Sequence, residues 1–108
     1  MTDIPIVNEL RQLACHGQLA SKEQWAALRQ FMQESQPCFY NKISDRSAGL
    51  TYQELYVCML VRLQFAPQEI AVLLGVSQQR ITNLRASINR KLFQRQGSKG
   101  IGEALQKL

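Results

Sequence analysis

The sequence predicts an all-α fold, a helical bundle that carries a helix-turn-helix in its C-terminal half. Apolar residues recur at helical rather than strand spacing along most of the 108 residues, and 45% of the residues are hydrophobic, which is enough for a modest core. Two capping-box signatures mark helix starts, at Ser21 with Gln24 and at Thr51 with Glu54. A third observation is a glycine-centred spacing within residues 66–85 that is typical of two helices packed across a short turn.

Two helices and a helical turn are expected in the first part of the chain. Asp3 can cap the first helix and Gly17 can end it. Ser21 opens the second helix, Pro37 breaks it, and a short helical turn over 38–43 follows. The side chains expected to face the core are Val7, Leu10, Leu13 and Ala14 in the first helix, Trp25, Leu28, Phe31 and Met32 in the second, and Phe39 and Ile43 in the turn.

The clearest helix start follows a polar loop at 44–49. Thr51 is the expected N-cap, and Leu50 and Leu55 are placed to form a hydrophobic staple around it. This helix is expected to reach about Gln64. Its apolar residues wrap most of the circumference, which predicts a central helix clasped by others: Leu55, Val57, Cys58, Met59, Leu60, Val61 and Leu63.

The helix-turn-helix is predicted from three positions. Ala71 is a small residue where the two helices cross, and Gly75 suits the left-handed turn between them. Ile81, six residues after the glycine, returns a branched apolar side chain to the core. Pro67 opens the first helix of the pair, and the second helix extends over about 77–93.

A last short helix is expected after the loop that contains Gly97. Its apolar stripe consists of Ile101, Leu105 and Leu108, which either form a homodimer contact or fold back on the same bundle. We expect residues 1–49 to be a helical extension packed on the core and residues 50–108 to be the helix-turn-helix unit.

Charge is unevenly distributed along the chain, whose formal net charge is +5. Residues 1–60 hold six acids and five bases, whereas residues 61–108 hold eight bases and two acids. From Arg80 to Lys99 there are six bases and no acid. A polyanion is therefore the expected partner of the C-terminal half.

The helix at 77–93 is expected to bury an aliphatic side, made of Ile81, Leu84, Ile88 and Leu92, and to present a polar one. On the polar side, the residues expected to read DNA bases in the major groove are Gln79, Thr82, Asn83, Ala86 and Arg90. Gln and Asn pair bidentately with adenine and Arg with guanine, while Ala allows close approach. Flanking phosphates are expected to contact Gln78, Arg80, Arg85, Lys91, Arg95 and Lys99.

Residues 50–56 (LTYQELY), 69–77 (EIAVLLGVS) and 90–92 (RKL) together resemble the LuxR-type four-helix DNA-binding domain of bacterial response regulators. The resemblance covers residues 50–108 and implies a scaffold helix, a recognition helix and a last helix that often makes the dimer contact. Two positions depart from the family pattern, because Thr82 replaces the usual lysine and Leu84 the common histidine.

Two further resemblances point the same way. The recognition helix looks like region 4 of sigma factors, in which Gln78, Gln79, Thr82 and Asn83 match promoter-reading positions, although glutamines replace two charged residues typical of that site. Residues 25–32 (WAALRQFM), 37–43 (PCFYNKI) and 50–65 (LTYQELYVCMLVRLQF) look like the C-terminal output region of large bacterial sensor proteins with tetratricopeptide and coiled-coil segments.

Several other kinds of site are not expected. Three cysteines without a CxxC spacing argue against a disulfide framework and a zinc knuckle, and the adjacent pair Cys15 and His16 has no second pair of metal ligands. The glycine-rich segment 97–102 lacks the spacing of a phosphate loop. We expect no cofactor, no metal, no small-molecule substrate, no membrane span and no catalysis, and we expect a reducing cytoplasm.

The sequence thus predicts a transcription-regulator output domain that binds double-stranded DNA through the helix at 77–93. The alternative is a protein-interaction module of the same fold, whose basic face contacts an acidic protein partner.

Overall fold

The computed structural model describes residues 5–45, 49–94, 97 and 100–107, and it confirms the all-helical fold class. Within these residues there is no strand. The helices are α1 (Pro5–Cys15), α2 (Lys22–Ser35), α3 (Pro37–Ser44), α4 (Tyr52–Arg62), α5 (Pro67–Leu74), α6 (Gln78–Phe93) and α7 (Ile101–Gln106).

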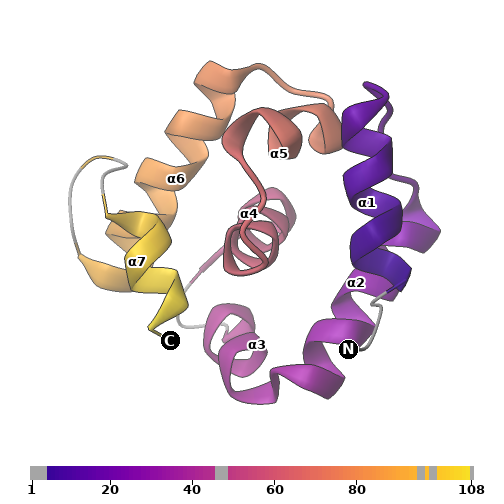
Figure 1. The fold of residues 1–108 in the computed structure, drawn as a ribbon. Helices are drawn as coiled ribbons and strands as arrows, with labels where there is room; N and C mark the ends of the chain where they lie inside the picture. Colours follow the sequence, from indigo (N-terminus) through magenta and orange to yellow (C-terminus); the bar gives the residue numbers. More distant parts are fainter. Residues whose placement is uncertain (1–4, 46–48, 95–96, 98–99, 108) are drawn as a thin grey trace.

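Helix α4 lies at the centre of the molecule, surrounded by the other helices (Figure 1). Helices α3, α5, α6 and α7 all pack against it. Five consecutive residues of α4 are buried: Val57, Cys58, Met59, Leu60 and Val61. A helix that is apolar on most sides must bury most of its circumference, so the predicted central position is confirmed.

Both predicted capping boxes are present. Ser21 Oγ accepts a hydrogen bond from the Gln24 amide at 3.2 Å, and Gln24 Oε1 accepts one from the Ser21 amide at 2.8 Å. At the start of α4, Thr51 and Glu54 make the same two bonds at 3.3 and 2.8 Å. Each box satisfies two amides that the first helical turn leaves without partners, so α2 and α4 begin where the sequence predicts.

Helices α5 and α6 are joined by residues 75–77. Pro67 is the first residue of α5. Glu69 Oε1 accepts a 2.7 Å hydrogen bond from the amide of Ala66, the residue before Pro67. Gly75 ends α5 with φ of 70°, a left-handed conformation that favours glycine. Ser77 then caps α6 by accepting from the Arg80 amide at 3.1 Å.

Arg11 joins α1 to the connection between α4 and α5. Its guanidinium lies 4.3 Å from the centre of the Phe65 ring and donates a 3.0 Å hydrogen bond to the Leu63 carbonyl. The same group lies 3.9 Å from Glu69 at the start of α5. The α1–α2 connection meets the other end of α5, where the Ala20 amide donates to the Leu73 carbonyl at 3.2 Å.

Helix α7 closes the bundle over the C-terminal end of α4. Gln106 Nε2 donates to the carbonyls of Val61 and Arg62 at 3.0 and 2.9 Å, and Arg62 Nη1 donates back to the carbonyls of Leu105 and Gln106 at 2.7 and 2.8 Å. These bonds satisfy carbonyls at the ends of both helices.

Two members of the expected apolar stripe pack against their own bundle. Ile101 and Leu105 are fully buried in the core of this chain. Leu108, the third member of the stripe, and Asp3, the expected first N-cap, lie outside the described residues. Helix α4 ends at Arg62, slightly before the expected Gln64, because Gln64 takes a positive φ of 68°.

A single hydrophobic core contains residues from both halves of the chain. Leu10 of α1, Leu28 of α2 and Ile88 of α6 belong to the same buried cluster. Residues 1–49 and 50–108 therefore share one core. No described helix combines the length and the hydropathy that crossing a lipid bilayer requires.

Candidate nucleic-acid interface

One side of α6 is held in the core and fixes the direction in which the other side points. Ile81, Leu84 and Ile88 are buried, as the 100° spacing predicts. Asn89 is also buried, and its Nδ2 donates to the Gly97 carbonyl at 3.0 Å. Leu92, the fourth residue of the expected aliphatic side, is only partly buried. Because Ile81, Leu84 and Ile88 are packed in the core, the helix cannot rotate without exposing them to water.

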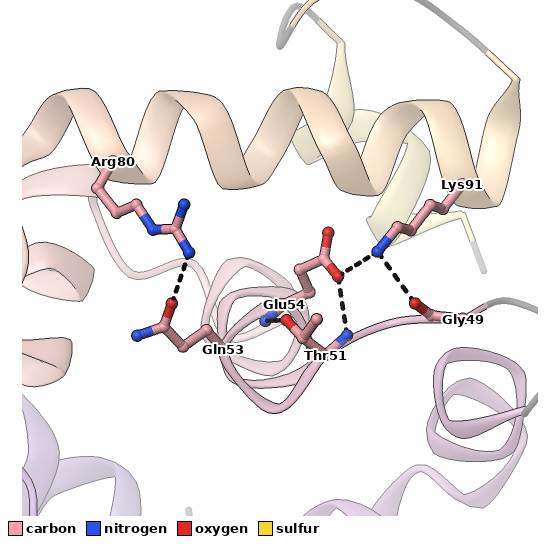
Figure 2. Close-up of polar contacts among 6 residues, drawn as sticks. All are labelled: Gly49, Thr51, Gln53, Glu54, Arg80 and Lys91. Carbon is pink, nitrogen blue, oxygen red and sulfur yellow. Dashed lines mark hydrogen bonds and ion pairs between the residues drawn. The ribbon is translucent and has the colours of Figure 1, made fainter.

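Polar contacts hold both ends of α6 across the first turn of α4, as Figure 2 shows. Near the start of α6, Arg80 Nη2 donates to Gln53 Oε1 at 3.1 Å. Near its end, Lys91 Nζ lies 2.7 Å from Glu54 Oε1 and donates to the Gly49 carbonyl at 3.0 Å. The two contacts are three helical turns apart, so they set the angle at which α6 crosses α4 as well as its distance.

Glu54 is a charged group in the core, with only 2% of its surface exposed. Burial alone would raise its pKa, but hydrogen bonds from Lys91, Ser87 and the Thr51 amide and the positive charge of Lys91 together hold the pKa below its ordinary value. The carboxylate therefore stays ionised, caps α4 and binds α6 at the same time.

The predicted base-reading residues lie on the outer side of α6. Gln79, Thr82, Asn83 and Arg90 are exposed, and Ala86 between them is half-buried. Gln79 Nε2 donates to Asn83 Oδ1 at 3.1 Å, so the two amides are aligned one turn apart along the helix. This outer row, Gln79, Thr82, Asn83, Ala86 and Arg90, is the candidate interface.

The predicted phosphate contacts divide into three groups. Gln78 and Arg80 are exposed beside the outer row. Lys91 is only partly exposed, and its ammonium is bound to Glu54 and to a backbone carbonyl, so its charge is already compensated within the fold. Arg95 and Lys99 lie outside the described residues.

Arg85, another of the expected phosphate contacts, is partly buried. It lines a groove of about 620 Å³ between α4, α5, α6 and α7, together with Phe65 and Lys107. Burial lowers the pKa of its guanidinium, and its Nε finds no hydrogen-bond acceptor among the described residues. The helical spacing could have predicted this partial burial, because Arg85 lies about 40° around the helix from the buried Ile81.

The described residues contain no cluster of His, Cys, Asp and Glu that could hold a metal ion. Cys15 and Cys38 are exposed, whereas Cys58 is buried, and burial raises the pKa of its thiol. The thiol of Cys58 is therefore protonated and packs as a small apolar group.

No protein-family model matches the chain, and neither curated proteins nor solved structures give a match.

Proposed function

We propose that this chain is the DNA-binding output domain of a transcription regulator and that α6 enters the major groove of duplex DNA. The observation that carries the proposal is the outer row of α6, in which exposed amide and guanidinium groups stand opposite the buried side chains of Ile81, Leu84 and Ile88. Helix α6 also carries four bases and no acid, which suits a polyanionic partner.

The chemistry of the outer row fits base edges. An amide of Gln or Asn can donate and accept toward adenine, and Arg can donate twice to guanine. Gln79 and Asn83 lie at the exposed N-terminal part of α6, and Arg90 lies two turns further along the helix. Sixteen residues of helix span about 24 Å, enough to follow a groove about 12 Å wide.

Phosphate contacts in this proposal come from Gln78 and Arg80, which are exposed beside the outer row. Arg80 is already held by Gln53, so its guanidinium is partly ordered before DNA binds. Arg85 and Lys91 are not part of this set, because Arg85 is partly buried beside a groove and Lys91 is paired with a buried carboxylate.

We further propose that α4 to α7 correspond to the four helices of a LuxR-type domain, in which α6 is the recognition helix. The order of a central helix, a short helix, a glycine turn and a long helix supports this assignment. In this arrangement α1 to α3 extend the core.

Fluorescence anisotropy with a random-sequence duplex tests the proposal. Binding in the micromolar range that weakens steeply as salt rises is expected, because each neutralised phosphate releases counterions. No binding even at low salt would refute DNA binding and favour the acidic protein partner.

Two variants with matched controls locate the interface. Arg90→Gln should weaken duplex binding several-fold, whereas Lys42→Gln, which removes the same charge from the exposed side of α3, should have little effect. Asn83→Ala should relax sequence preference at one position by about 1–3 kcal/mol. Asn41→Ala on α3 is its control, and equal effects of the two asparagine variants would contradict the placement of the interface on α6.

A further inference from the structure

A second surface, on the other side of α4, combines aromatic rings with positive charge. A hollow of about 480 Å³ lies between the N-terminal parts of α2 and α4. Its lining consists of Lys22, Trp25 and Arg29 from α2 and Tyr52 and Tyr56 from α4. We call this set the aromatic hollow; none of its lining residues is acidic.

Two rings of the aromatic hollow are held against each other, and a third is exposed to solvent. Trp25 and Tyr56 are stacked, with ring centres 4.2 Å apart and planes 8° apart, which fixes both rings. Tyr52, one turn before Tyr56, is 70% exposed. A large aromatic side chain at such exposure leaves a π face in water, where it can stack with a planar partner.

The cations of the aromatic hollow stand on one side of α2. Lys22 and Arg29 are seven residues apart, so they project from the same face of the helix two turns apart. Arg29 is partly buried, and its Nε finds no hydrogen-bond acceptor in the described part of the chain. An anion bound beside this guanidinium would compensate the charge of a partly buried group.

Both helix starts at the hollow are already closed by capping boxes, so the positive charge of the hollow comes from the side chains of Lys22 and Arg29. The hollow thus offers a phosphate two cations, and it offers a planar ring a stacking partner.

We propose that the aromatic hollow binds a nucleotide unit, with the base stacked on Tyr52 and the phosphate held by Arg29 and Lys22. A simple anion would use the cations but not the exposed ring, and an apolar ligand would leave Arg29 unsatisfied. The nucleotide is either free or part of a single strand, because the recognised chemistry is the same. This site is independent of duplex binding by α6.

The chain's only tryptophan provides the readout, because Trp25 lines the hollow. Adenosine monophosphate and a short single-stranded oligonucleotide are titrated against Trp25 emission, and equilibrium dialysis measures the bound monophosphate directly. We expect a saturable change in emission with at least one of them. The monophosphate arm tests a free nucleotide, and the oligonucleotide arm tests a nucleotide within a strand.

Variants test the assignment of roles. Tyr52→Ala and Arg29→Gln should each raise the Kd about tenfold, a change of the size that one stacked base contributes. Tyr52→Phe keeps an aromatic ring, so its Kd should stay close to that of the unaltered protein. Lys42→Gln, an exposed charge change on α3, should alter the Kd less than about twofold.

Three results would overturn the nucleotide site. The first is that neither ligand binds; the second is that binding survives unchanged in both Tyr52→Ala and Arg29→Gln. The third is that inorganic phosphate competes as well as the monophosphate, which would mean that the base contributes nothing. Duplex anisotropy that weakens with Arg90→Gln but not with Arg29→Gln assigns duplex binding to α6, so failure of either proposal can be told from failure of the other.

Discussion

At the residue scale, Gly75 carries two separate constraints. Its φ of 70° is strained for any residue with a side chain, and a Cβ built there would lie 2.5 Å from Leu19 Cδ2. Gly17 has the same φ, but a Cβ there meets nothing within 4 Å. Leu19 is 63% exposed, so its side chain can move aside. The two glycines therefore separate backbone strain from steric contact.

Alanine substitutions measure these two terms. Gly17→Ala should lower the free energy of unfolding by about 1 kcal/mol through strain alone, and Gly75→Ala should cost the same or somewhat more. In the double variant Gly75→Ala/Leu19→Ala, the loss of unfolding free energy should equal that of Gly17→Ala. Urea denaturation gives the numbers, with Gly102→Ala, inside α7, as a control that is neutral or stabilising. A Gly75→Ala protein as stable as Gly102→Ala would show that the turn between α5 and α6 is wrongly described.

At the element scale, the position of α6 depends on the buried ion pair of Glu54 and Lys91. The Glu54 carboxylate serves two helices, since it caps α4 and binds α6 in the same place. Gln24 performs the capping role in α2 with an amide oxygen. A glutamine at position 54 can therefore keep the cap and remove only the charge.

Glu54→Gln should destabilise the fold in a pH-dependent way. The folded pKa of Glu54 is lowered, so its stabilising contribution is present above the pKa of an unfolded glutamate, about 4.3, and is lost as pH falls through the folded value. We expect a loss of about 1–3 kcal/mol near neutral pH that shrinks below about pH 4. Urea denaturation at several pH values checks this, with the exposed Glu103→Gln as control. A loss that is constant with pH would exclude the ion pair as its cause.

Most helices could be predicted because their boundaries are local. Ser21 with Gln24, Thr51 with Glu54, and Gly75 act within one turn of the helix ends that they set, so short sequence windows contain the signal. The burial of Phe39 and Ile43 followed from the same periodicity. The all-helical class was therefore accessible from the sequence.

The contacts around the candidate interface were harder to predict from the sequence. The Lys91–Glu54 pair joins residues 37 apart, and nothing local distinguishes Lys91 from a solvated lysine. The aromatic hollow likewise depends on the packing of α2 against α4, which brings Trp25 and Tyr56 together. Arg85 is different, because strict use of the helical spacing places it on the inner side of α6.

At the scale of the whole molecule, both halves of the sequence contribute to one core. The Cα radius of gyration is 13.1 Å, and a single domain of this length is expected to have about 13 Å. Arg11 bonds the N-terminal helix to the middle of the chain, and Arg62 joins α4 to Gln36 before α3 and to Leu105 in α7. The bonds from Arg11 to Leu63 and from Arg62 to Gln36 cross the boundary at residue 49, so neither half has a complete set of packing partners alone.

Because the two halves share one core, we expect the chain to unfold in one cooperative transition. Trp25 reports on the N-terminal half, whereas far-UV circular dichroism reports on every helix, and the two denaturation curves should coincide. Leu10→Ala, fully buried in α1, should shift both curves by about 2–5 kcal/mol, while Leu19→Ala, largely exposed, should shift neither appreciably. Curves that separate in the Leu10→Ala protein, with Trp25 unfolding first and α6 still helical, would mean that residues 1–49 are an independent extension whose loss leaves the DNA-binding half folded.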